Sequence, residues 1–340
     1  MVDLTARKFL YTYGPVPSRR LGRSLGVSII PPKACSYSCV YCQLGSTNQL
    51  RYKRESFFLK KRILDEIVNH PALPITEYIT FVGDGEPTLS LDLGWLINET
   101  KRLTQQNIAV ITNGSLLYRA DVREDLKSAD VVLPSLDAGS EDVFKKINRP
   151  HGKIRFDAML QGLIDFRRQY TGQIWLEVML VKDVNDTVRA LNDLKKIIAQ
   201  VNPHRIYIMT PVRPPAEDWA EPSSPDKIIR AQEILGTEQV FSLMEEGEFN
   251  TNSFTDAATA IMEIGTRHPL RFEQAHAIED KMGQSGIVSQ MMKEGKLVPV
   301  SYQRTDYLIP ALFIRSGSNC QIPPDRSTAQ HIFSSHTKKK

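Results

Sequence analysis

The sequence predicts an α/β protein in which six parallel strands alternate with helices along the chain. Between about residues 24 and 211, short β-branched or apolar runs alternate with longer segments in which apolar residues recur every three or four positions. This alternation is typical of strands joined by crossover helices. Such an array is parallel, has right-handed connections, and either stays open or curls into a partial barrel.

The individual elements can be placed in chain order. Apolar runs that end at proline, glycine or asparagine predict strands at 25–30, 78–82, 108–112, 131–136, 174–181 and 206–209. Helical periodicity predicts a helix that ends near residue 71, followed by helices near 93–103, 156–170 and 188–201. The carboxyl ends of all six strands share one edge, so we expect the chemistry of the protein at that edge.

The chain changes character after the last expected strand. Prolines and serines gather between residues 211 and 225 and predict a boundary near residue 240. Three short helices and a hairpin follow, and this order resembles a winged helix. From residue 311 the sequence is polar and aperiodic, as in a flexible tail. The expected domains are a core at 1–240, a winged-helix-like domain at 250–310 and a tail at 311–340.

The composition sets limits on the class of protein. The chain has 340 residues, of which 41% are hydrophobic, and its 43 Lys and Arg against 39 Asp and Glu give a net charge of +4. This length excludes a disulfide-stapled miniprotein, and this charge gives no support to a protein that coats nucleic acid. The sequence has no signal-like or membrane-spanning apolar run, and three of its four cysteines are clustered. We expect a cytoplasmic protein with reduced thiols and no membrane partner.

A cluster of three cysteines is the strongest functional signal. Cys35, Cys39 and Cys42 lie within eight positions, in the loop after the first expected strand. Three thiolates from one short loop suit a soft metal site. A structural zinc site commonly has four protein ligands, and no second pair of cysteines or histidines lies nearby. We therefore expect three ligands to a metal centre that keeps one position open.

Polar residues and glycines follow the next strands at the same edge of the sheet. Gly83, Gly85 and Glu86 come after the second strand, Asn113 after the third and Ser135 after the fourth. Glycine allows close approach of a backbone to a ligand, and a carboxylate accepts hydrogen bonds from an ammonium group. The alternative for each is ordinary turn and capping chemistry. Four weaker candidates are Asp137, Glu177, Asn185 and Asp186.

The spacing Cys-x3-Cys-x-aromatic-Cys after a first strand resembles the radical S-adenosylmethionine (SAM) superfamily. The resemblance implies that Cys35, Cys39 and Cys42 ligate a [4Fe-4S] cluster whose fourth iron binds SAM. It implies that Tyr41 lies against the adenine, and that the segment from Gly83 to Glu86 holds the methionyl amino group. Asn113 and Ser135 are the further candidate cofactor contacts. The expected fold is then a partial (βα)6 barrel with a small C-terminal winged-helix-like domain.

Two further segments resemble one branch of the superfamily. Tyr13–Ser24 and Asn148–Pro150 are similar to uncharacterised iron-sulfur oxidoreductases that are grouped with wyosine-forming tRNA enzymes. Three arginines at positions 19, 20 and 23 suit phosphate or carboxylate groups of a substrate, or equally surface carboxylates. The wyosine enzymes use additional upstream cysteines for a second cluster. This chain has none before Cys35, and we expect Cys320 to be a bystander.

The resemblance implies an enzyme that cleaves SAM reductively to a 5'-deoxyadenosyl radical, which abstracts hydrogen from a substrate. The cofactors are then a [4Fe-4S] cluster and SAM, and the partner is an electron donor such as flavodoxin or ferredoxin. We favour tRNA or other RNA as the substrate, with a partner protein as the alternative. The rival outside this class is a metal-containing regulator that binds nucleic acid. Basic residues of the C-terminal domain interleave with acidic ones, which leaves RNA binding and protein docking open.

Overall fold

The computed structural model describes residues 9–18, 20–47, 49–237, 249, 251 and 254–311. The boundary expected near residue 240 and nearly all of the expected tail lie outside these described residues. Arg19 and Cys320 lie outside them as well.

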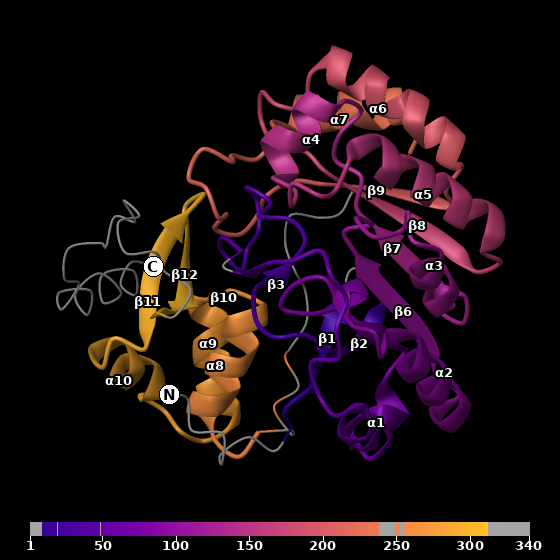
Figure 1. The fold of residues 1–340 in the computed structure, drawn as a ribbon. Coiled ribbons are helices and arrows are strands. Elements are labelled where there is room, and N and C mark those ends of the chain that lie inside the picture. Colours follow the sequence, from indigo (N-terminus) through magenta and orange to yellow (C-terminus); the bar gives the residue numbers. More distant parts are fainter. Residues whose placement is uncertain are drawn as a thin grey trace.

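A curved seven-stranded sheet forms the main body, as the sequence predicts for a partial barrel (Figure 1). Its strands are ordered β1-β2-β5-β6-β7-β8-β9. They cover Thr12–Ser18, Gly22–Val27, Tyr78–Phe81, Asn107–Thr112, Val131–Pro134, Gln173–Met179 and Arg205–Met209. Strand β1 is antiparallel to β2, and the six strands from β2 onward pair in parallel.

Helices form a layer on the outer face of this sheet (Figure 1). They are α1 (Lys60–Val68), α2 (Leu93–Thr104), α3 (Ala120–Leu126), α4 (Glu141–Asn148), α5 (Phe156–Gln169), α6 (Val188–Val201) and α7 (Pro225–Leu235). Alternate strand residues face opposite sides, so Ile108 and Val110 pack into the main core with the helices. Ala109 lies in a second cluster with Val131 and Trp175. Because both faces of the sheet are buried, apolar residues of its central strands point to both sides.

The six predicted strands and the helices α1, α2, α5 and α6 agree with the structure to within a few residues, whereas β1, α3, α4 and α7 were not predicted. Strand β2 begins earlier than expected because β1 pairs with it from Gly22 onward. Strand β1 itself contains Pro15 and Pro17, and prolines weaken the sequence signal for a strand. Helices α3 and α4 have seven and eight residues, too short for a clear helical period.

The second body, here called the C-terminal unit, contains three helices and a small antiparallel sheet ordered β10-β12-β11. Its elements are α8 (Ala257–Arg267), β10 (Leu270–Arg271), α9 (Phe272–Lys281), α10 (Ile287–Lys293), β11 (Leu297–Tyr302) and β12 (Thr305–Pro310). Figure 1 shows it beside the barrel, where α8 contacts β1. The Tyr302 and Tyr307 hydroxyls donate hydrogen bonds to the carbonyls of Pro211 and Val212, at 3.1 and 2.8 Å. These bonds tie the unit to the chain just after β9.

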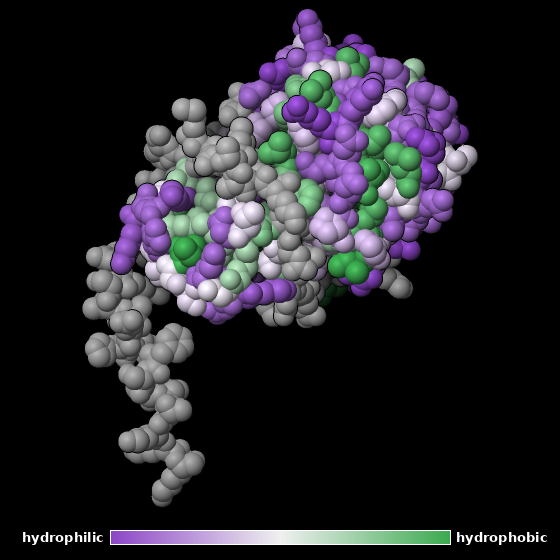
Figure 2. Space-filling view, turned by 90° about the horizontal axis from the view of Figure 1, so that it is seen from below, coloured by the Kyte–Doolittle hydropathy of each residue, from purple (hydrophilic) through white to green (hydrophobic). Residues whose placement is uncertain are grey.

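Two short stretches, η2 (Leu73–Ile75) and η3 (Pro87–Leu89), are 3-10 turns, and β3 (Ala34–Cys35) pairs with β4 (Gln49–Leu50). The view from below in Figure 2 shows mainly hydrophilic residues with hydrophobic ones interspersed. Among the described residues, none of the helices has the length and apolar character needed to cross a membrane.

Candidate functional site

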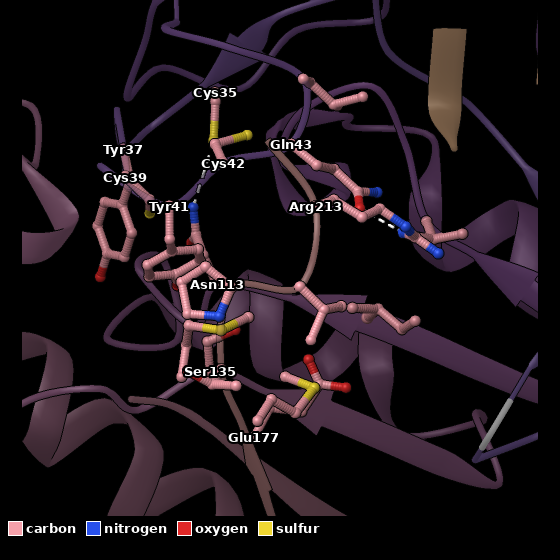
Figure 3. A pocket seen from close by; sticks show the side chains of 18 of the residues that line it. Cys35, Tyr37, Cys39, Tyr41, Cys42, Gln43, Asn113, Ser135, Glu177 and Arg213 are labelled. Atoms are coloured by element: carbon pink, nitrogen blue, oxygen red, sulfur yellow. Dashed lines mark hydrogen bonds between the residues drawn. The ribbon is translucent and has the colours of Figure 1, made fainter. Parts of the chain in front are cut away.

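A cavity of about 600 Å³ lies at the carboxyl ends of the barrel strands. This volume is within the usual range for small-molecule and cofactor sites. All nine predicted site residues line it, namely Cys35, Cys39, Cys42, Tyr41, Gly83, Gly85, Glu86, Asn113 and Ser135. Figure 3 shows the cysteines on one side of the cavity, with Asn113 and Ser135 between them and Glu177. The structure thus brings together residues from the ends of four strands.

Cys35 is the last residue of β3, and Cys39 and Cys42 lie in the loop that runs from β3 to β4; this stretch is called the cysteine loop. All three are partly exposed free thiols. Burial raises the pKa of Cys35 to about 12, with the nearby Glu86 carboxylate contributing, and burial also raises the pKa values of Cys39 and Cys42. In the metal-free chain these groups are therefore neutral thiols, and a metal that binds them must displace three protons.

The three thiols are not arranged as ligands of a single ion. Within the part of the chain that the structure describes, no three His, Cys, Asp or Glu side chains converge closely enough to hold one metal ion. In a [4Fe-4S] cluster each cysteine binds a different iron, so the ligands surround a larger group. Three soft donors around one cavity fit such a cluster.

The segment after β5 packs directly against the cysteine loop. The amide of Glu86 donates a 3.0 Å hydrogen bond to the carbonyl of Ala34, the residue before Cys35. A Cβ atom on Gly85 would lie 1.8 Å from the same carbonyl oxygen, so no side chain fits there. Gly85 therefore brings the segment close to the backbone that carries the first cysteine.

Glu86 is buried, in contrast to the solvated residue of a simple turn. The residue is only 1% exposed. Oε1 accepts hydrogen bonds from the Thr88 amide (3.0 Å), the Thr88 hydroxyl and the Thr112 hydroxyl, and Oε2 accepts one from the Asn113 amide (2.7 Å). Burial raises the pKa of this carboxyl, and the four donors counteract that shift. The carboxylate thus joins the ends of β5 and β6 at the cavity wall.

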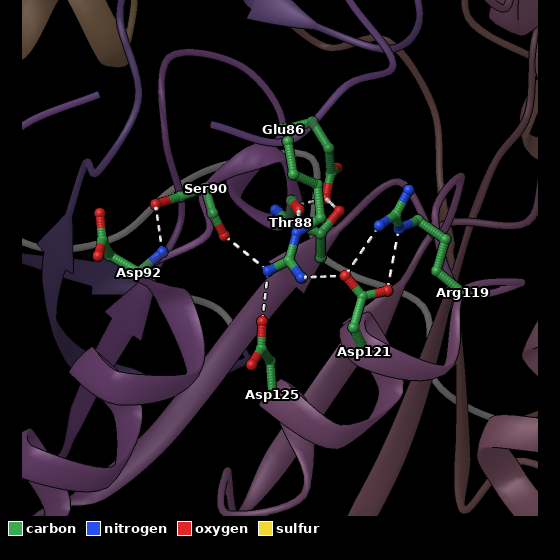
Figure 4. Close-up of polar contacts among 8 residues, drawn as sticks. Glu86, Thr88, Ser90, Asp92, Arg119, Asp121 and Asp125 are labelled. Carbon is green, nitrogen blue, oxygen red and sulfur yellow. Dashed lines mark hydrogen bonds and ion pairs between the residues drawn. The ribbon is translucent and has the colours of Figure 1, made fainter. Parts of the chain in front are cut away.

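Arg54 fixes the turn that follows Glu86 from the outer side. Its guanidinium, with a side chain only 3% exposed, donates to the carbonyls of Thr88 (2.9 Å) and Ser90 (2.7 Å). It also pairs with Asp121 at 2.8 Å and with Asp125. In Figure 4 both carboxylates lie on one side of the turn, and Arg119 holds Asp121 from the other side. These charge-assisted bonds connect the turn to helix α3.

Replacing Arg54 by leucine is expected to lower the free energy of unfolding by about 1–3 kcal/mol, the usual cost of leaving a buried hydrogen-bonding group without its partner. The carbonyls of Thr88 and Ser90 would lose their donor, and Asp125 would lose its cation. Urea denaturation measures the change. The control is Arg168→Leu. The Arg168 side chain is 72% exposed and lies 3.8 Å from Asp165, and such surface ion pairs contribute little to stability. Equal stability of the two variants would contradict this account.

Two asparagine side chains reach the cysteine sulfurs. Asn113 Nδ2 lies 3.5 Å from Cys35 Sγ and donates to the Ser36 hydroxyl at 2.8 Å. Asn148 Nδ2 lies 3.6 Å from Cys39 Sγ and donates to Asp137 at 2.7 Å. The Tyr41 hydroxyl also donates to Asp137, at 2.6 Å. The side chain of Asp137 is therefore bound within the protein, next to the cysteine loop.

The remaining candidates divide between the cavity and the scaffold. Glu177 lines the cavity and pairs with Arg20, whereas Arg23 pairs with Glu77 on the surface at 2.9 Å. Asn185 holds the backbone around β8 through the amide of Val181 and the carbonyls of Asp137 and Met179. Asp186 accepts from the Ser223 hydroxyl and pairs with Lys227, and Thr187 is the residue that caps α6. Asn185 and Asp186 are scaffold residues.

Several cavity residues have no clear signal in the sequence. Gln43 and Arg213 contact each other across the cavity wall (Figure 3). Met179, Met209, Ile228 and Ile229 contribute apolar side chains to the lining of the cavity. Arg213 could have been predicted as a site residue, because it follows the last strand at the same edge of the sheet. Gln43 directly follows the last cysteine, but glutamine there carries no chemical signal by itself.

Sequence comparisons place the chain among known proteins. Residues 29–194 match the model of the radical SAM superfamily. The UPF0026 protein MJ1312 of Methanocaldococcus jannaschii is 36% identical over 301 residues, which cover 85% of this chain and 92% of the relative. A protein named GTPase Obg from Brachyspira hyodysenteriae is 38% identical over 299 residues. Here the match covers 84% of this chain but only 43% of the relative.

A comparison of structures agrees with the sequence matches on the fold. A solved structure of TYW1 with a lysine-pyruvate adduct bound superimposes with a TM-score of 0.50 and 17% identity, over 66% of this chain and 76% of that one. At this identity the likeness concerns the fold alone. The chain belongs to the radical SAM superfamily, whose members are enzymes that use a [4Fe-4S] cluster and SAM, and within it to the UPF0026 family.

Proposed function

We propose that Cys35, Cys39 and Cys42 hold the [4Fe-4S] cluster and that the cavity beside them binds SAM. The observation that carries the proposal is the meeting of three cysteine thiols and four strand ends around one cavity of about 600 Å³. The donor set fits the cluster, because thiolates are its usual protein ligands and the loop supplies three. When bound, the cluster supplies the electron for reductive cleavage of SAM.

The residues of this chain bind and orient the cofactor. Tyr41 and Ser135 offer an aromatic ring and a hydroxyl to the adenosyl part, and Asn113 offers a side-chain amide next to Cys35. Gly83 and Gly85 present backbone groups to the methionyl amino group. Glu86 Oε2, which accepts one bond within the protein, provides the nearby negative charge. The apolar wall around Ile228 and Ile229 limits access of water.

We further propose tRNA or another RNA as the substrate. The support is the resemblance of Tyr13–Ser24 and Asn148–Pro150 to the wyosine-related branch, together with the winged-helix-like order of elements in the C-terminal unit. The assignment rests on this analogy. In this proposal the enzyme is cytoplasmic and takes its electron from a flavodoxin or ferredoxin.

The test begins with protein purified without oxygen and reconstituted with iron and sulfide. We expect about four irons per chain and a reduced electron paramagnetic resonance (EPR) spectrum that changes when SAM is added. Release of 5'-deoxyadenosine then reports cleavage. A metal analysis that finds zinc, or a cluster whose spectrum is unaffected by SAM, would contradict the proposed site.

The substrate class is tested by the same release assay. Unmodified tRNA, transcribed in vitro, is compared with a soluble protein fraction freed of nucleic acid. Faster deoxyadenosine release with tRNA, together with a mass change in its nucleosides, supports RNA modification. Stimulation by the protein fraction alone would overturn the RNA assignment in favour of a protein substrate.

A further inference from the structure

The segment from residue 147 to 151 lies against the cysteine loop, although more than one hundred positions separate them in the sequence. The two meet through a bridge between Tyr37 and Pro150. The backbone hydrogen bonds between them run from Ser38 N to Asn148 O (3.0 Å), from Val40 N to Ile147 O (2.9 Å) and from His151 N to Ser36 O (2.8 Å). The 147–151 segment thus holds the backbone of the loop on both sides of Cys39.

Asn148 adds a side-chain contact to the loop. It is only 3% exposed, and its amide nitrogen lies 2.7 Å from Asp137 Oδ2 and 3.6 Å from Cys39 Sγ. Asp137 also accepts from the Tyr41 hydroxyl and the Met179 amide, so its oxygens act as acceptors. An acceptor there requires the NH2 group of Asn148 on that side. One N–H of this group serves Asp137, and the other is directed to the sulfur.

We propose that Asn148 is a positioning residue that donates a hydrogen bond to the Cys39 thiolate and thereby makes the bound cluster easier to reduce. A donor on a ligating sulfur stabilises the extra negative charge of the reduced cluster more than the charge of the oxidised one. The step is the transfer of one electron to the cluster from a flavodoxin, a ferredoxin or a chemical reductant. Asn148 gives up no proton. This inference rests on the proposed ligation by Cys39.

The alternative is that Asn148 only holds the loop in place. Its neighbour Arg149 provides a comparison, because Arg149 pairs with Glu217 at 2.6 Å and the Glu217 amide donates to the carbonyl of Val40. Arg149 therefore supports the same loop, while its guanidinium donates to a carboxylate. A change at position 148 affects both the sulfur contact and the loop, whereas a change at position 149 affects the loop alone. Comparing the two separates the effect of the hydrogen bond from the effect of loop support.

The test is a redox titration of the reconstituted cluster, followed by EPR, in the wild-type chain and in Asn148→Leu. Leucine has a similar size but no N–H donor. We expect the equilibrium between reduced and oxidised cluster to shift about tenfold toward the oxidised form, which lowers the potential by about 59 mV for one electron. Arg149→Gln should leave the potential of the wild type unchanged. Asn148→Ala, which also lacks a side-chain donor, replaces the leucine variant if that chain fails to bind iron.

A second measurement reports the hydrogen bond directly. After exchange into D2O, electron-nuclear double resonance of the reduced cluster detects deuterons close to its sulfurs. We expect a coupling that disappears in Asn148→Leu and persists in Arg149→Gln. An unchanged potential and coupling in the Asn148 variant that binds iron, or an equal shift in Arg149→Gln, would overturn the inference. A wild-type chain without a [4Fe-4S] cluster would instead refute the proposed ligation.

Discussion

Replacing any one of Cys35, Cys39 and Cys42 by serine is expected to abolish both the cluster and the cleavage of SAM. Each sulfur occupies its own place around the cavity, and the three come from one loop held by the 147–151 segment. A hydroxyl is a poor ligand for iron in this setting, because cluster irons favour thiolates. The measurements are iron and sulfide content, the EPR spectrum and deoxyadenosine release, which should all fall to background.

The matched control is Cys320→Ser. Cys320 is the fourth cysteine of the chain and lies outside the described residues. We expect this variant to bind the same amount of iron as the wild type and to cleave SAM at the same rate. A variant of Cys35, Cys39 or Cys42 that retains cleavage would remove that residue from the ligand set. Loss of iron in Cys320→Ser would instead add a fourth ligand.

The second large effect is expected for Glu86→Gln. The glutamine amide has the shape of the carboxylate, but its NH2 group would meet donors, since Thr88, Thr112 and Asn113 all donate to Glu86. A buried donor left without an acceptor costs about 1–3 kcal/mol. We therefore expect a lower unfolding temperature and a dissociation constant for SAM at least about tenfold higher, corresponding to about 1.4 kcal/mol.

Calorimetry of SAM binding and thermal unfolding measure the two effects, with Glu124→Gln as the control. The Glu124 side chain is 69% exposed and pairs with Lys127 on the surface, where ion pairs contribute little. This control should resemble the wild type in both measurements. Wild-type affinity for SAM in Glu86→Gln would show that the carboxylate stabilises only the protein. Wild-type stability would contradict the hydrogen-bond network described for it.

The barrel and the cavity could be predicted from the sequence because both depend on local patterns. Apolar runs mark the parallel strands, and motifs at strand ends meet because parallel strands end at one edge. Strand β1 was not predicted, because its prolines interrupt the strand pattern. Nor could the contact between Asn148 and Cys39 be predicted, since it spans 109 positions. Such a contact is set by tertiary packing and produces no periodic pattern in the sequence.

The arginines at positions 19, 20 and 23 illustrate a similar limit. Their spacing left substrate contacts and surface ion pairs equally open, and the structure separates two of them. Arg20 is directed to Glu177 in the cavity, and Arg23 is directed to Glu77 on the surface. Arg20 lies in the turn that precedes β2, whereas Arg23 lies within the strand. The sequence could not show this, because the pairing with β1 that sets the register was itself not predicted.

The contact between the 147–151 segment and the cysteine loop has a consequence for synthesis of the chain. A ribosome releases the three cysteines long before it releases Asn148 and its neighbours, and until then the loop lacks the backbone partners that hold it. During that interval the nascent thiols are accessible to oxidants and to competing metals such as zinc. The loop can therefore acquire its final backbone partners only after residue 151 has emerged.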